Sequence, residues 1–260
     1  MTISRAQLAK ELEPGLNALF GLEYDRYENE AKEIFESESS DRAFEEEVML
    51  SGFGTAPVKS EGSAISFDDA QETYTARYTM ETIALAFSIT EEAVEDNLYD
   101  RLAARYTRAL ARSMAQTKQI KGATVLNNAF STGSPIGDGA ALCSAAHPSL
   151  SGNQNNLLAT PADLNETSLE EILIQIAGFT DERGLKIAVR GTKLLIPKEL
   201  QFIAERIINS NLRPGSADND INAMKSMGML PQGAVVNHFF TDADAYFVKT
   251  DCPNGFKLFN

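Results

Sequence analysis

The chain has 260 residues, of which 43% are hydrophobic, and its 23 Lys and Arg against 37 Asp and Glu give a formal net charge of −14. This length allows one large domain or two modest ones, with enough apolar side chains for a core. The acidic balance argues against a protein that binds nucleic-acid phosphates or anionic lipid across its surface.

Other features of the sequence bear on the compartment. No apolar run approaches the roughly 18 residues of a membrane span, so we expect no membrane partner. The first residues do not form a secretory signal, which predicts a cytosol-like compartment. Cys143 and Cys252 lie far apart in the sequence and do not make a disulfide framework.

Residues 1–50 hold 13 acidic and 5 basic side chains, so −8 of the net charge lies in this segment. Its apolar side chains are separated by acidic blocks such as 45–47, which makes the segment too polar to fold alone. One interpretation is an arm that docks on another surface, such as a neighbouring copy. The alternative is a pair of amphipathic helices that covers the chain's own core.

Residues 51–80 carry the pattern of a β-hairpin, in which Gly62-Ser63 forms the turn. A long ribbon of this kind could not stand alone in water, so we expect its partners outside its own chain. Apolar side chains further along alternate as in a half-buried strand: Tyr74, Ala76, Tyr78 and Met80. After Glu81 the apolar positions become odd-numbered, which predicts a bulge or change of face and entry into a core.

A long helix is predicted from Thr90, a good N-cap residue followed by two glutamates. If it continues past Gly122 to Phe130, it is about 60 Å long. An arginine stripe on the other side predicts a solvated or salt-bridged surface, with nucleic-acid contact as the alternative: Arg101, Arg105, Arg108 and Arg112. One apolar sector is expected to be its buried face: Leu98, Tyr99, Leu102, Ala103, Tyr106, Ala109, Leu110 and Met114.

The remaining sequence reads as a loop over 131–166 and then as an α/β unit. Ser168 with Glu171 is the pattern of a capping box, and Pro197 is typical of a helix start. The predicted elements are a helix at 169–179, strands at 185–189 and 193–196, a helix after Pro197, a polar loop at 209–230, and a strand pair at 234–240 and 245–249.

Chemical motifs are sparse. Cys143, His147, His238 and Cys252 are candidate zinc ligands, but their spacing matches no common zinc module. Cys143 and His147 could be read as a nucleophile and base, although neighbours in sequence seldom form such a pair and no oxyanion hole is marked. The sequence therefore predicts no catalytic residue, no cofactor site and no metal site.

Several stretches together resemble the major capsid protein of tailed bacteriophages, in particular the Mu-like prophage major head subunit family. The stretches cover nearly the whole chain: ETIALAFSITEEAVEDN at 81–97, AAHP at 145–148, TSLEE at 167–171, DERGLKIA at 181–188, LLIPKEL at 194–200, DNDINAMK at 218–225 and TDCPNGFK at 250–257.

The resemblance implies an α+β fold, the tailed-phage major capsid fold. It implies an N-terminal arm at 1–50, an extended β-hairpin loop at 51–80, a peripheral domain with a long spine helix at 81–160 and 246–260, and an axial α/β domain at 161–245. Members of the family usually run on through a last strand that returns to the peripheral domain. This chain stops at Asn260, so we expect its end to be trimmed or disordered.

The function implied is that of a structural protein, not an enzyme, which self-assembles into pentamers and hexamers of an icosahedral shell around phage double-stranded DNA. The DNA would be enclosed without sequence-specific binding, in a virion assembled in the bacterial cytoplasm. Scaffold, portal and decoration proteins are the other partners implied. The alternatives from other classes are a cytosolic hydrolase using Cys143 and His147, and an isolated binding module.

Overall fold

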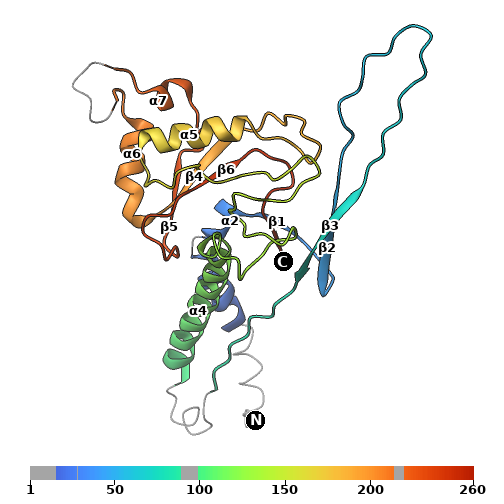
Figure 1. Cartoon of the computed structure of the whole chain (residues 1–260). Coiled ribbons are helices and arrows are strands. Elements are labelled where there is room, and N and C mark those ends of the chain that lie inside the picture. Colours follow the sequence, from blue (N-terminus) through green and yellow to red (C-terminus); the bar gives the residue numbers. More distant parts are fainter. Residues whose placement is uncertain (1–15, 28, 89–98, 214–219) are drawn as a thin grey trace. The chain divides into compact units, whose positions relative to one another are not determined.

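The computed structural model describes residues 16–27, 29–88, 99–213 and 220–260 (Figure 1). The chain divides into two compact units, one formed by residues 1–32 with 81–122 and the other by residues 33–80 with 123–260. No helix in the described part of the chain is long and apolar enough to cross a bilayer.

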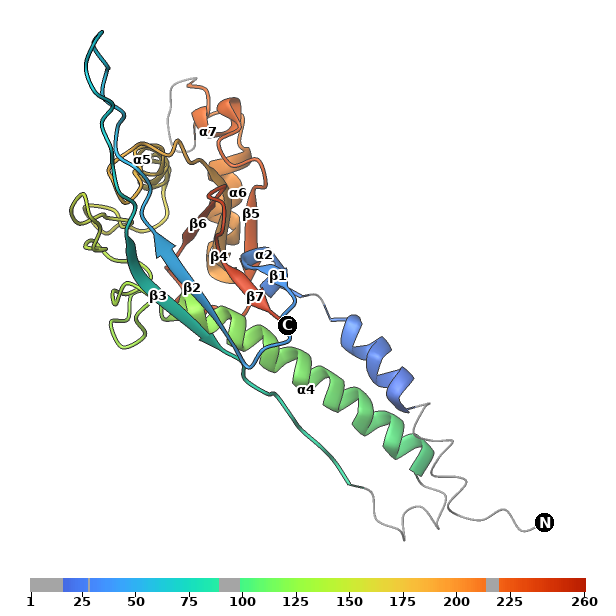
Figure 2. The ribbon, with the colours of Figure 1, turned by 90° about the vertical axis from the view of Figure 1, so that its right-hand side faces the viewer.

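The first unit is built around α4 (Tyr99–Asn127), which packs with a helix at residues 16–25 (Figure 2). At 1.5 Å per residue the 29 residues of α4 span about 44 Å. Arg108 of the arginine stripe pairs with Glu23 at 3.5 Å, as expected of a salt-bridged surface. The helix continues past Gly122 and ends at Asn127, before Phe130. Its predicted cap, Thr90, and residues 1–15 of the arm lie outside the described residues.

The buried face of α4 differs from the predicted one. Leu102 and Tyr106, in the predicted buried sector, are 39% and 48% exposed. The side chains that are buried recur every four residues and are mostly small: Ala103, Thr107, Ala111, Ala115 and Gln119. Small side chains let another backbone approach α4 closely. The backbone amide of Ala31 comes near enough to donate a hydrogen bond to the Gln119 side chain at 3.0 Å.

Residues 81–88 form no regular strand and do not enter a core, so that prediction is wrong. Ile83, Leu85 and Phe87 are 36–56% exposed. The segment is tied to α4 by an ion pair between Glu81 and Lys121 at 2.7 Å and by ring contact between Phe87 and Tyr106. The shift of the apolar residues from even-numbered to odd-numbered positions after Glu81 coincides instead with the passage of the chain from one unit to the other.

The second unit contains a three-stranded sheet in the order β5–β4–β6. β4 (Gly191–Pro197) pairs in parallel with β5 (Ala234–Asn237) and antiparallel with β6 (Phe247–Thr250). The last two strands were predicted to pair with each other, but β4 lies between them. β4 is the central strand and its residues 193–197 are all buried, so Leu194–Ile196 form a short continuous apolar run rather than an alternating one.

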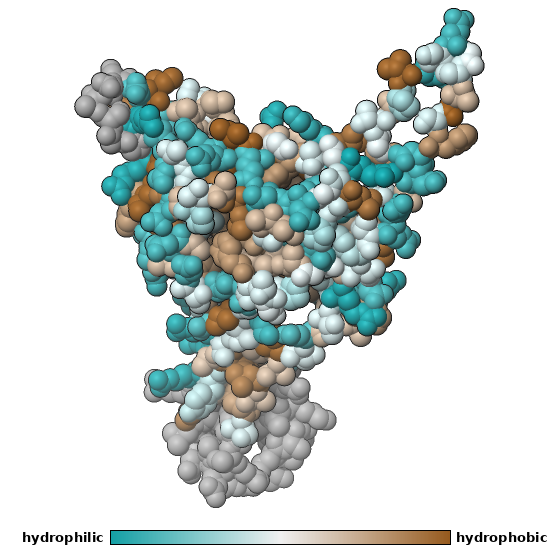
Figure 3. All heavy atoms as spheres, viewed as in Figure 1, coloured by the Kyte–Doolittle hydropathy of each residue, from teal (hydrophilic) through white to brown (hydrophobic). Residues whose placement is uncertain are grey.

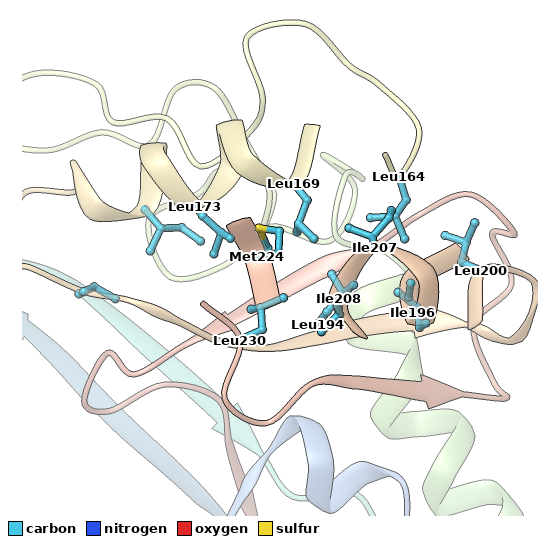
Figure 4. Packing of buried hydrophobic residues seen from close by; sticks show 13 residues of the cluster. Leu164, Leu169, Leu173, Leu194, Ile196, Leu200, Ile207, Ile208, Met224 and Leu230 are labelled. Carbon is cyan, nitrogen blue, oxygen red and sulfur yellow. The ribbon is translucent and has the colours of Figure 1, made fainter. Parts of the chain in front are cut away.

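Helices cover one side of this sheet and complete the core (Figure 4). They are α5 (Glu166–Ala177), η1 (Lys198–Leu200), α6 (Gln201–Asn209) and α7 (Ala223–Met227). The core cluster includes Leu164, Leu169, Leu173, Leu194, Ile196, Leu200, Ala204, Ile207, Ile208, Met224 and Leu230. The helix after Pro197 is therefore confirmed, and the apolar side chains at helical spacing along it are buried: Leu200, Ala204, Ile207 and Ile208.

Several local predictions in this unit are corrected. Asn165, not Ser168, is the N-cap of α5, and the Ser168 side chain closes the capping box from the N3 position. Residues 185–189 form no strand and contribute only an isolated bridge, from Lys186 to Thr180. The stretch at 209–230 holds a short helix, α7, because the buried Asn222 caps it.

Both ends of the second unit meet in a small parallel pair of strands, β1 (Glu36–Glu38) and β7 (Lys257–Phe259). β1 follows α2 (Ala31–Ile34), and β7 directly precedes Asn260. Phe256 packs edge-on against Phe35, with ring centroids 5.7 Å apart. The expectation of a disordered end is therefore wrong, because aromatic contacts and strand pairing hold the last residues.

Candidate assembly surface

The β-hairpin predicted from the sequence is present, but its first strand starts earlier than expected. β2 (Phe44–Leu50) pairs antiparallel with β3 (Glu72–Thr79). β2 falls within the segment predicted to be the arm, because the run of three glutamates conceals its alternation. In the register, Glu45 and Glu47 lie on the same face as Tyr78 and Ala76, opposite the face of Phe44 and Val48.

The two faces of the hairpin differ in their contacts. On the face toward its own chain, Glu47 is paired with Lys257 at 2.6 Å, and this hydrogen bond raises the pKa of Lys257. The opposite face carries apolar side chains that are 43–65% exposed: Phe44, Val48 and Leu50. The same face also carries Glu46, which pairs with Arg77 at 2.6 Å, and the Arg77 guanidinium lies 4.3 Å from the ring centre of Phe44. Exposed apolar side chains beside an ion pair are typical of a surface that contacts another molecule.

Beyond the strands, residues 51–71 form a long loop that extends away from the sheet of the same unit (Figure 1). It reverses at a turn in which the Ser63 amide donates to the Ser60 carbonyl and Gly62 has a φ of 79°. Three large apolar side chains near this turn are almost fully exposed: Val58 at 98%, Ile65 at 71% and Phe67 at 95%. Figure 3 shows brown, hydrophobic residues on the projecting loop.

The base of this loop is clasped by Arg183. Its guanidinium donates to the Gly52 carbonyl at 3.2 Å, to the Asp68 carboxylate at 2.8 Å and to the Asp69 carbonyl at 2.9 Å. Asp68 also accepts from the Gly54 amide at 2.7 Å. That amide, followed by the positive charge of Arg183, lowers the pKa of Asp68. The two limbs of the loop are thereby joined at their root.

The strand β3 rests on a second loop, which contains Gly137. A Cβ placed on Gly137 would lie 2.9 Å from the Cβ of Ala76 and 3.4 Å from Tyr74 Cδ2, so only glycine fits without a shift. Burial, together with the charges of Glu182 and Asp138, raises the pKa of Tyr74. The root of the hairpin is thus fixed by close packing, while its loop and outer face are uncovered.

The residues considered for a nucleophile and base are not joined to each other in the described part of the chain. Burial raises the pKa of the Cys143 thiol to about 11, which disfavours the thiolate a nucleophile requires. His147 binds Asp138 through Nδ1 at 2.6 Å, a partner that the sequence did not reveal because both residues lie in the predicted loop 131–166. Within the described ranges no hydrogen bond joins Cys143 to His147, and no cluster of three potential metal ligands occurs.

Comparison with known proteins gives the family. The family model described as phage capsid protein matches residues 73–257. No curated protein matches the chain.

Solved structures from one phage share the fold. The bacteriophage JBD30 capsid has a TM-score of 0.61 at 11% identity, over 80% of this chain and 89% of that chain. The procapsid of the same phage has a TM-score of 0.60 at 13% identity, over 91% of this chain and 100% of that chain. The JBD30 capsid decorated with minor capsid protein trimers has a TM-score of 0.58 at 12% identity, over 80% and 89%.

The expected α+β capsid fold is thereby confirmed, whereas nothing supports the hydrolase alternative. A projecting hairpin with uncovered apolar side chains is also what a shell-forming subunit requires. The match over residues 73–257 shows that the chain belongs to the phage capsid protein family.

Proposed function

We propose that the chain assembles through its hairpin into pentamers and hexamers, which close into an icosahedral shell around the phage double-stranded DNA. The observation that carries this proposal is the near-complete exposure of Val58 and Phe67 on a loop whose root is rigidly held. Burying such side chains on neighbouring copies couples folding free energy to assembly. Contacts between unlike surfaces of identical copies close into rings.

We assign the parts of the chain by the roles that the resemblance implies. Residues 1–50 contribute the arm, 51–80 the extended loop, 81–160 and 246–260 the peripheral domain with α4 as its spine, and 161–245 the axial domain. The hairpin strand from Phe44 acts with the extended loop, since β2 and β3 form one ladder. The Mu-like subfamily is the assignment we favour within the family.

The partners follow from the same proposal. The shell forms in the cytoplasm of the bacterial host and becomes part of the virion, with scaffold and portal proteins taking part. One structure similar to this chain is a capsid decorated with minor capsid protein trimers, and we propose a decoration protein here too. The net charge of −14 suits an inner wall that encloses DNA without binding it by sequence. The chain itself catalyses no reaction.

The loop that includes Asp218 and Asp220 is proposed to lie at the centre of each ring. In a five- or six-fold arrangement these carboxylates would converge, which is unfavourable unless a cation or base offsets them. Arg213 and Lys225, the nearest bases in sequence, are already engaged by Glu166 at 2.9 Å and by Asn211 at 2.6 Å. Replacing Asp220 by Lys should therefore disturb ring closure more than the thermal stability of the subunit.

The direct test is to determine the assembly state of the purified full chain by sedimentation and negative-stain electron microscopy. We expect rings or closed shells, and we expect deletion of residues 59–66 to weaken or misdirect assembly while the subunit stays folded. The matched pair is V58S/F67S against S63A/S66A, which changes the same loop without removing its large apolar side chains. Normal particles from the deletion variant, with unchanged stability, would contradict the proposal.

A further inference from the structure

The second unit contains an apolar pocket of about 550 Å³ that the described residues of the chain leave unfilled. Its wall comprises the end of α4, the loop 142–162, helix α5 and the strand β6 with the residues before it. Large apolar side chains dominate the lining, including Phe130, Leu142, Ile172 and Phe247. A volume of this size is typical of cavities that enclose a small ligand or a few side chains.

The surroundings of the pocket are rigid and weakly polar. The rings of Phe130 and Phe247 stack with centroids 5.8 Å apart, and Phe240 meets Phe247 edge-on at 5.9 Å. Cys143 lines the same pocket, and burial alone raises the pKa of its thiol. A preformed apolar surface with fixed aromatic walls favours an apolar occupant over a charged one.

The chain carries matching apolar groups on the loop of the hairpin. Val58, Ile65 and Phe67 project from its two limbs with 71–98% of their surface exposed. The loop cannot bring them to the pocket of its own chain, because Arg183 and the contact of Gly137 with Ala76 fix the root. Their natural position is therefore against a different copy.

The charges beside these groups are also complementary. Lys59 and Glu61 flank the turn of the loop, and Lys59 makes no ion pair within the described ranges. At the pocket, Asp242 and Asp244 are exposed, and Lys249 lies on the adjoining strand. Lys59 can thus meet the two aspartates while Glu61 meets Lys249, which would fix the direction in which the loop enters.

We propose that this pocket receives the loop of the hairpin from a second copy of the chain, with Val58 and Phe67 as its apolar anchors. The inference rests on the proposed assembly and adds the receiving site to it. Each subunit would then donate one loop and accept another, so the contact is heterologous and propagates around a ring.

Disulfide trapping tests the proposal, because Cys143 already lines the pocket. The variant S66C/C252S leaves the apolar anchors in place, removes the exposed cysteine and puts one thiol on the loop. A disulfide forms only where two Cα atoms come within about 7 Å, with two electrons passing to an added oxidant such as copper phenanthroline. We use pH 9, because the thiol of Cys143 has a pKa of about 11.

The expected result is a ladder of covalent oligomers, up to the size of the ring, on a non-reducing gel. The ladder must vanish in S66C/C143S/C252S and must not form in E205C/C252S, which places the thiol on the exposed surface of α6. A ladder from E205C/C252S would mean that chance collisions cause the linkage, and would overturn the proposal.

Two other outcomes decide against it in distinguishable ways. If rings or shells form but S66C never links to Cys143, the receiving site is wrong while the proposed function stands. A link from S4C/C252S to Cys143, with none from S66C, would instead assign the pocket to the N-terminal segment. If the unaltered chain forms neither rings nor shells, the proposed function itself fails.

Discussion

Replacing Gly137 by Ala is the sharpest test of how the hairpin is held. The added Cβ would lie 2.9 Å from the Cβ of Ala76, and the next nearest atoms are a ring carbon of Tyr74 and the Cα of Ala76. Carbon atoms prefer separations of about 3.5–4.0 Å, so strand β3 or the loop must move by roughly 0.6–1 Å. Neither neighbour on Ala76 can rotate away, because one is backbone and the other is bonded to it.

Overpacking of this kind usually costs about 1–3 kcal/mol. A loss near 2 kcal/mol would lower the midpoint of thermal unfolding by about 4–8 °C in a domain of this size. Gly133, in the same loop, is the matched control, because a Cβ there meets only the Ser131 hydroxyl at an ordinary 3.5 Å. G133A should be neutral or stabilising by about 0.4–1 kcal/mol, since alanine restricts the unfolded chain.

The assay combines thermal unfolding with hydrogen exchange of the amides of residues 72–79. G137A should speed their exchange, and A76G in the same chain should restore part of the loss by making room. A double-mutant cycle should therefore give a coupling energy of about 0.5–3 kcal/mol between the two positions. Equal midpoints for G137A and G133A, or strictly additive effects with A76G, would refute the reasoning.

Three further predictions concern other contacts. R183A should increase proteolysis within residues 52–69 without shifting the main unfolding transition, because it removes the clasp at the root of the loop. The pKa of Asp68 is lowered, so the ion pair with Arg183 is complete above the ordinary aspartate pKa of about 3.9 and is lost as the pH falls below it. Acid should therefore reproduce the effect of the variant. N222A should destabilise the subunit by about 2–4 kcal/mol in chemical denaturation, since it removes the cap of α7 and leaves the Ile207 carbonyl, bonded at 2.6 Å, without its donor. Cys143 should react with a maleimide much more slowly than the exposed Cys252 at pH 7.5, and its reaction rate should keep rising with pH toward about 11. Equal rates for the two thiols would contradict the burial of Cys143, and C143S should leave assembly unchanged.

Sequence patterns predicted the elements whose side chains are arranged by local periodicity. The apolar run Leu194–Ile196 marked a buried strand, and the spacing of Ile203, Ile207 and Ile208 marked α6, because burial there depends on the side chains themselves. The buried face of α4 escaped prediction for the opposite reason. Its alanines contribute little hydrophobicity, and they are buried because small side chains permit close approach of a neighbour.

Long-range contacts explain the other failures. β2 was concealed because Glu47 faces inward, and it can do so only through Lys257, 210 residues away. The separation of β5 from β6 depends on the insertion of β4 between them, which no local pattern encodes. The sequence predicted that the hairpin has its partners outside its own chain, but it did not single out the exposed apolar side chains Val58, Ile65 and Phe67. The pocket proposed to receive them combines residues from 126 to 256, which no local pattern brings together.

The pairing of β1 with β7 has a consequence for the order of events during synthesis. Lys257 holds Glu47, and Phe259 packs on Tyr78 with ring centroids 5.8 Å apart, so the last described residues complete the root of the hairpin. Translation adds about 5–20 residues per second, and these contacts form only after every other described element has been made. Until these contacts form, the clasp of Arg183 and the packing of Gly137 against Ala76 hold the root of the hairpin in the nascent chain.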